Sequence, residues 1–158
     1  MEDWVDRIIE AEDKQASDQA ASDELESQRT AMLLARSPYL WAKFAKEVKE
    51  RVKRYTQRRP SEQPNVRFEE RSSKRILVSR SAPLAELEIW LNERGALIEY
   101  YRLVAGAGEE SAPQRGALEI KIGRSHALML FDGQGRTDVG PAVEYLLKPI
   151  LFPGHGDS

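Results

Sequence analysis

Cysteine is absent from the 158 residues, and histidine occurs only twice, at His126 and His155. Without cysteine the chain cannot form disulfides, thiolate nucleophiles or cysteine-ligated metal sites. A transition-metal site would need both histidines to converge with carboxylates. We therefore expect no metal and no cofactor, and the reducing cytoplasm is the expected location.

Long apolar runs and a basic N-terminus are also missing. No segment approaches the roughly eighteen consecutive apolar residues of a membrane span. The chain begins with the acidic residues Glu2, Asp3 and Asp6, whereas a secretory signal begins with bases. With 41% hydrophobic and 32% charged residues, the composition indicates a soluble globular protein without membrane association. Its length suits a single domain, residues 1–158.

Glycine is absent before Gly95, and all ten glycines lie at or beyond that position. The first half of the glycine-free part has a sequence typical of helix. From about Val66 onward, short segments in which apolar and polar residues alternate predict strands. The sequence therefore predicts an α+β fold, with N-terminal helices and one C-terminal helix packed on one face of a five- to six-stranded antiparallel meander sheet. The expected segments are an acidic helical arm (1–36), an amphipathic basic helix (37–59), the sheet (65–132) and the C-terminal helix (138–152).

The helical segments differ in how well their apolar residues repeat. Trp4, Val5, Ile8 and Ile9 form one apolar stripe at helical spacing. In residues 13–24 the only apolar residues are alanines, which predicts either a solvated helix or a mobile joint between two shorter helices. Ser37-Pro38 predicts a new helix start, with serine as the N-cap. Apolar residues then recur every three or four positions until Pro60 and Pro64 end the helix: Leu40, Phe44, Val48, Val52 and Tyr55. A last helix is expected from about Pro141 to Lys148, closed by Pro149 and Pro153-Gly154.

Six strands are predicted, at 66–71, 75–80, 85–91, 97–104, 117–122 and 127–131. In the third, Leu87, Ile89 and Leu91 alternate with Glu86, Glu88 and Trp90, which indicates one buried and one wet face. The turn at 92–95 is expected to place Gly95 at positive φ. The fourth strand leaves two choices open, because one register turns Glu99 toward the core and the other turns Arg102 inward.

The sequence contains no strong catalytic, phosphate-binding or calcium-binding motif. No Gly-x-Ser-x-Gly occurs, and the glycines at 106 and 108 are followed by two glutamates that would repel phosphate. Asp132 to Asp138 resemble a calcium loop only in part, since Arg136 stands where an oxygen ligand is needed. We therefore expect a non-catalytic protein.

Charge is unevenly distributed along the chain. Residues 1–26 hold ten acids against two bases, and residues 43–59 hold eight bases against two acids. Either these two segments lie near each other, or the basic helix 43–59 binds a polyanion. The second choice is a nucleic-acid hypothesis that would use Lys49, Lys53 and Arg54.

The leading functional hypothesis is a cytoplasmic protein-binding or adaptor module that self-associates through Trp4, Ile8 and Ile9, with the outward Trp90 as a further interface residue. An alternative is a small-ligand pocket, enzymatic or not, between the sheet and the C-terminal helix, with polar contacts from Glu99, Tyr100, Tyr101 or Arg102. The sequence favours a protein partner or self-association over nucleic acid.

Overall fold

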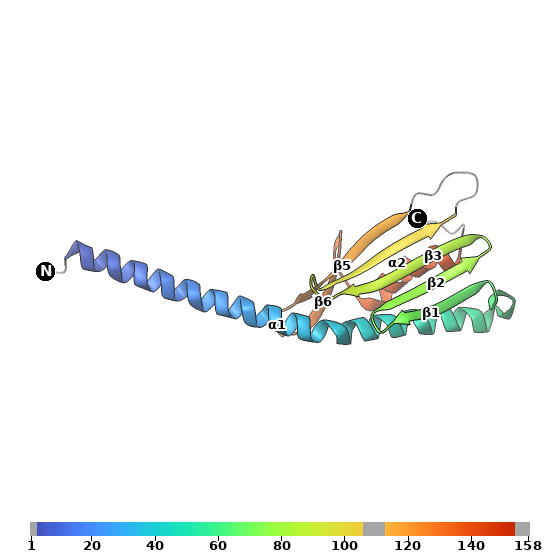
Figure 1. Ribbon diagram of the computed structural model, residues 1–158, viewed down its shortest axis with the longest axis horizontal. Helices are drawn as coiled ribbons and strands as arrows, with labels where there is room; N and C mark the ends of the chain where they lie inside the picture. Colours follow the sequence, from blue (N-terminus) through green and yellow to red (C-terminus); the bar gives the residue numbers. More distant parts are fainter. Residues whose placement is uncertain (1–2, 106–112, 154–158) are drawn as a thin grey trace.

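The computed structural model describes residues 3–105 and 113–153. It has the expected α+β fold, in which all strands follow one another as neighbours in a single antiparallel meander. The elements are α1 (Trp4–Arg58), a 3-10 turn η1 (Pro60–Glu62), β1 (Val66–Ser72), β2 (Arg75–Ser81), β3 (Leu84–Asn92), β4 (Leu97–Val104), β5 (Gln114–Ile122), β6 (Leu128–Asp132), β7 (Gly135–Thr137) and α2 (Val139–Leu151). Figure 1 shows this order.

The sheet has seven strands instead of five or six. The additional strand, β7, is only three residues long and pairs with β6 across the turn at 133–134. Such a short strand carries no alternation that sequence analysis could detect.

The helix α1 is much longer than any predicted helix. Its C-terminal half is amphipathic, and the residues buried against the sheet recur every three or four positions: Trp41, Phe44, Val48, Val52 and Tyr55. Its N-terminal part projects well beyond the sheet, with the N-terminus far from the body (Figure 1). Residues 13–24 are therefore part of a solvated helix, and not a joint.

The prediction of a new helix start at Ser37-Pro38 is wrong. α1 runs through Pro38 without a break. Because proline has no amide hydrogen, the carbonyl of Leu34 loses its usual donor four residues later. The buried Ser37 hydroxyl donates to that carbonyl at 3.3 Å instead. Ser37 thus satisfies the acceptor that Pro38 leaves open, and does not act as an N-cap.

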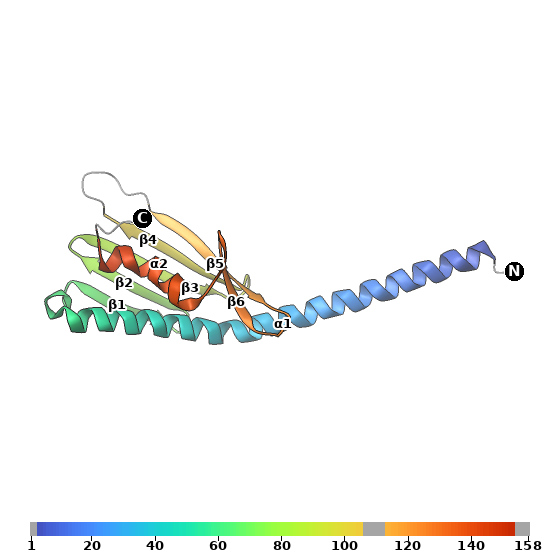
Figure 2. The same ribbon diagram turned by 180° about the vertical axis from the view of Figure 1, so that it is seen from behind.

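Both helices cover the same face of the sheet, as Figure 2 shows from behind. α2 packs on β2, β3 and β4, while α1 packs on β1, β5 and β6. The inner face of β3 carries Leu87, Ile89 and Leu91, as predicted. In β4, Ile98 and Arg102 are buried, which settles the open choice of register in favour of Arg102.

α2 spans nearly the whole of the expected segment 138–152, but Pro149 lies inside it and does not help to close it, since the helix continues to Leu151. Two buried arginines on the inner face of the sheet hold its last turns. Arg102 Nη1 donates to the Tyr145 carbonyl at 2.7 Å, which is the acceptor that Pro149 leaves open. Arg80 Nε and Nη2 donate to the carbonyls of Ile150 and Leu151 at 2.9 and 2.8 Å.

The turn after β3 differs in one detail from its prediction. Asn92 Oδ1 accepts from the Gly95 amide at 3.2 Å, but the residue with positive φ is Ala96, at 51°. Residues 106–112 and 154–158, which include His155 and the glycines at 106 and 108, lie outside the described residues.

Candidate interaction surface

The projecting part of α1, residues 3–31, is called the arm. Every one of its residues is exposed. Its apolar residues lie at the far end, where Trp4 is 65% exposed and Ile8 and Ile9 are each 49% exposed. An exposed tryptophan beside two isoleucines is a feature of interaction sites, since soluble proteins rarely leave such clusters open.

Opposite charges occupy the two ends of this one helix. The acidic segment centres near Asp13 and the basic segment near Arg51. At about 1.5 Å of rise per residue, these centres are about 57 Å apart along the helix axis. The two segments therefore do not meet within one chain, contrary to the first of the two explanations suggested by the sequence.

A groove of about 700 Å³ runs between the basic half of α1 and α2. Its apolar lining comes from Tyr55, Leu147, Leu151 and Phe152. Five bases and three acids line it as well: Arg51, Arg54, Arg58, Arg59, Lys148, Glu47, Glu50 and Glu144. The groove therefore offers an apolar surface beside an excess of positive charge.

The bases of this groove differ in how far they are already engaged. Arg51 Nε pairs with Glu47 at 2.8 Å, and Arg59 stacks over the rings of Tyr55 and Phe152. Arg54 and Arg58 are exposed and have no ion pair or hydrogen bond within the described ranges 3–105 and 113–153. Their guanidinium groups are thus available to an external partner.

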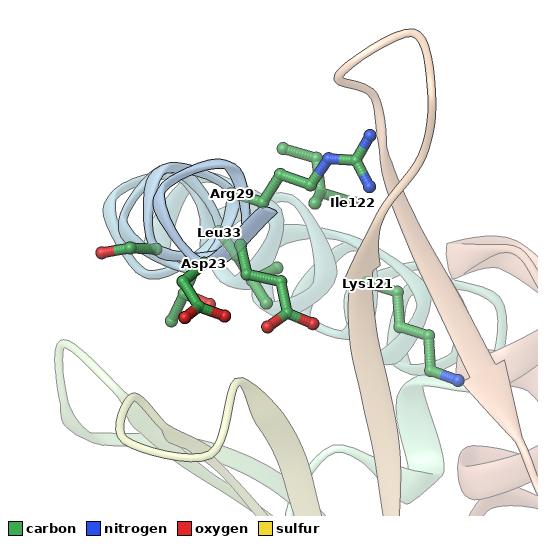
Figure 3. Close-up of a pocket in the computed structure, with 8 residues that line it drawn as sticks. Asp23, Arg29, Leu33, Lys121 and Ile122 are labelled. Carbon is green, nitrogen blue, oxygen red and sulfur yellow. The ribbon is translucent and has the colours of Figure 1, made fainter. Parts of the chain in front are cut away.

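A second groove, of about 640 Å³, lies where the arm leaves the body. In Figure 3 the side chain of Arg29 on α1 extends toward Ile122 at the end of β5. Asp23 and Leu33 of α1 and Lys121 of β5 line the same groove. Nearby, Arg36 Nη1 donates to the His126 carbonyl. This contact joins α1, just beyond the arm, to the connection between β5 and β6.

The basic-helix residues Lys49, Lys53 and Arg54 are all exposed on α1, so the structure leaves them accessible. Trp90 lies on the outer face of the sheet, where it is only half-exposed. Its indole Nε1 donates to Glu99 Oε2 at 2.8 Å, and Arg75 stacks over its ring at 4.9 Å. Trp90 therefore already has partners within the chain.

The four candidate pocket residues of β4 divide between the two faces of the sheet, so only Tyr100 and Arg102 come together. Glu99 and Tyr101 lie on the outer face and Tyr100 and Arg102 on the inner face. Arg102 is 2% exposed and donates to Gln114 Oε1 from Nε at 3.1 Å, besides its contact with α2. The space between sheet and α2 is filled by buried apolar side chains: Leu87, Ile89, Ile98, Val143, Leu146 and Ile150.

Tyr100 has the most perturbed environment among these residues. Burial raises the pKa of its phenol, and a side-chain hydrogen bond with Tyr145 raises it further, whereas the nearby Arg102 lowers it. The ring lies over Gly116, its partner on β5. Tyr100 is therefore a neutral packing residue near neutral pH.

Within residues 3–105 and 113–153, no three metal-ligating side chains of histidine, aspartate or glutamate come together. In the same part of the chain, neither helix is both long and apolar enough to cross a bilayer. Comparison with protein-family models, with curated proteins and with solved structures finds no match to this chain.

Sequence reasoning missed the α2 wall of the groove and the role of Arg80. The sequence did carry a signal for Arg80. Its side chain alternates in step with Ile76 and Val78 on β2, so all three point toward the inner face of the sheet. A charged residue in an otherwise apolar alternating set indicates a buried cation with polar partners. The groove had no such signal, since it depends on how α1 and α2 pack.

Proposed function

We propose that the protein is a non-catalytic protein-binding module that self-associates through its arm. The observation that carries this proposal is the exposure of Trp4, Ile8 and Ile9 at the far end of the arm, where every described residue is exposed. In water, burying such side chains contributes about 1.5–3 kcal/mol each.

The composition of the arm supports a partner as well. Helices gain most of their stability from packing, and isolated ones are marginal even when their sequences favour helix. Residues 13–24 contain aspartate and serine, which have weaker helix propensities than alanine. A partner surface along the arm would stabilise its helix.

The test is sedimentation equilibrium of the full-length chain from about 1 to 100 µM, a range that resolves a dimer with a Kd in the micromolar range. We expect a concentration-dependent dimer and a rise of helical circular dichroism with association. The double substitution Trp4→Ser and Ile8→Ser is expected to shift the equilibrium to monomer.

A matched control is Leu84→Ser, which removes an apolar side chain of similar exposure, 50%, from the start of β3. This variant should dimerise like the wild type. A full-length protein that stays monomeric over the whole range would refute self-association.

A further inference from the structure

We infer that the arms of two copies pair antiparallel, so that Trp4 of each copy enters the groove beside the other copy's arm. This groove, of about 640 Å³, is called the root groove, and Arg29, Leu33, Lys121 and Ile122 are among its lining residues (Figure 3). The inference rests on the self-association proposed above and adds the orientation, the register and the docking site.

The most exposed apolar side chains of the arm fall on one heptad seam. Leu25 is 59% exposed and follows Trp4 by 21 residues, which is three heptads. Ile8 takes the other core position of the first heptad. With alternating spacings of four and three, the seam consists of Trp4, Ile8, Ala11, Gln15, Asp18, Ser22, Leu25 and Arg29. Such spacing is typical of a helix that packs lengthwise on a second helix. Ile9 lies about 100° around the helix from Ile8 and is outside the seam.

The charged residues of the seam favour the antiparallel orientation. A parallel pair in register sets every seam residue against its own counterpart, so Asp18 faces Asp18 and Arg29 faces Arg29. Like charges that face each other between helices are destabilising. The parallel pair would gain an ion pair at the flank, between Arg7 and Glu12, but exposed ion pairs contribute little. Antiparallel pairing separates the like charges of the seam.

The apolar residues then fix the register. With a two-fold axis level with residues 16 and 17, Ile8 of one copy lies against Leu25 of the other, and Trp4 lies against Arg29. A shift by one heptad in one direction sets Ile8 against Asp18, and a shift in the other sets Leu25 against a polar residue. The register that pairs the two apolar residues is therefore the favoured one.

The middle of the seam is compatible with this register. Ala11 lies against Ser22, and both are small enough to let the two helices approach closely. Gln15 lies against Asp18, so its side-chain amide can donate to the carboxylate. Each of these contacts occurs twice in the pair because of the two-fold symmetry.

The root groove lies where this register places the indole of Trp4. Arg29 makes no ion pair or hydrogen bond in the part of the chain that the structure describes, so its guanidinium can stack on the incoming ring. Leu33, one turn further along α1, and Ile122, at the end of β5, supply apolar walls. The indole is thus buried between two apolar side chains and a cation.

The contact has the size of a specific but reversible interface. Residues 3–31 span about 43 Å at about 1.5 Å of rise per residue. A strip about 10 Å wide along this length buries about 430 Å² on each copy, and a tryptophan side chain can bury about 150–250 Å². The two copies together reach about 1,000–1,200 Å², which is the lower end of the range for specific interfaces.

Ile8 and Ile9 provide a matched test of the seam, since they are neighbours of the same type and are both 49% exposed. In sedimentation equilibrium of the full-length protein, Ile8→Ser should weaken the dimer at least about tenfold, because the contact with Leu25 is lost twice. Ile9→Ser should stay within about threefold of the wild type. Equal weakening by both variants would reject the seam while self-association stands. A monomeric wild type overturns both proposals and leaves the arm to a different protein.

Cross-linking distinguishes the two orientations, because the chain has no cysteine of its own. Under mild oxidation, a full-length chain with Ala11→Cys mixed with one carrying Ser22→Cys should form a disulfide-linked heterodimer. Ala11→Cys alone should not cross-link, since the two copies of residue 11 are about 16 Å apart along the axis of an antiparallel pair. A parallel pair gives the reverse result and would overturn the inference.

A single added charge tests the register independently. Gln15→Lys sets a lysine against Asp18 of the other copy at both contacts, so the dimer should become about threefold tighter or more. In a parallel pair the two lysines would face each other and weaken it. Ser17→Lys adds the same charge to the acidic arm away from the seam and should have a smaller effect. Equal effects of the two variants would mean that residue 15 does not face Asp18.

The root groove is tested by Arg29→Ala, which removes the cation under the indole. We expect the dimer to weaken about fivefold or more, because the cation–π contact is lost twice. The control Arg67→Ala, at an exposed position of β1, should stay within about twofold. If Arg29→Ala dimerises normally while Ile8→Ser does not, the arms pair but the root groove is the wrong site for Trp4.

Discussion

The Ser37 hydroxyl donates to the carbonyl oxygen of Leu34, the acceptor that Pro38 deprives of its backbone donor. Ser37→Ala should therefore reduce the free energy of unfolding by about 1 kcal/mol, because a partly buried carbonyl is left without a partner. The measurement is urea unfolding monitored by circular dichroism.

The variant Pro38→Ala provides the control for this interpretation. With alanine at position 38, the backbone amide can donate to the Leu34 carbonyl, and the serine is no longer needed. In that background Ser37→Ala should be close to neutral. An equal cost of Ser37→Ala in both backgrounds would mean that the hydroxyl does not compensate for the proline.

Arg102 holds α2 in a corresponding way, through its contact with the Tyr145 carbonyl. Arg102→Lys keeps the charge but loses the planar guanidinium group, whose several N–H donors bind Tyr145 and Gln114 at once. We therefore expect a loss of about 2–3 kcal/mol in the free energy of unfolding. Arg94→Lys, at an exposed turn, should change it by less than about 0.5 kcal/mol. In a Pro149→Ala background the cost of Arg102→Lys should be smaller, because the new amide at 149 can donate to the same carbonyl.

These two prolines explain where sequence analysis was incomplete. The helical and strand periodicities correctly predicted the α+β fold, the antiparallel meander and the buried face of β3. The helix start at Pro38 and the closing role of Pro149 were wrong, because each proline is compensated by a neighbour that becomes visible only in three dimensions. For Pro38 that neighbour is adjacent in sequence, but for Pro149 it is Arg102, on another element. The exposed arm residues could be named from the sequence, whereas the groove arises from the packing of α1 against α2 and has no local pattern.

The close approach of Tyr100 to Gly116 gives a third prediction. A Cβ atom added at Gly116 would lie 2.4 Å from the Tyr100 hydroxyl oxygen and 2.6 Å from Cζ. Gly116→Ala should therefore destabilise the protein by about 1–3 kcal/mol, since the ring must move out of its packed position. In a Tyr100→Leu background the shorter side chain should remove most of this cost. Gly133→Ala, where nothing lies within 4 Å, serves as the control and should be nearly neutral.

The raised pKa of Tyr100 predicts a specific alkaline instability. Burial and the hydrogen bond with Tyr145 favour the protonated phenol in the folded state. In the unfolded chain the phenol titrates near pH 10. The stabilising contribution of this group is therefore fully present below about pH 10 and is lost as the pH rises through the higher folded-state pKa.

Unfolding in urea between pH 8 and pH 11 checks this sign, with Tyr100→Phe as the comparison. The variant should differ from the wild type by a constant amount up to about pH 10. At higher pH the wild type should lose stability more steeply than the variant, because only the wild type must keep a proton on a buried phenol. Parallel curves up to pH 11 would show that the environment of Tyr100 does not favour the neutral form, and that the contact with Tyr145 contributes nothing to its titration.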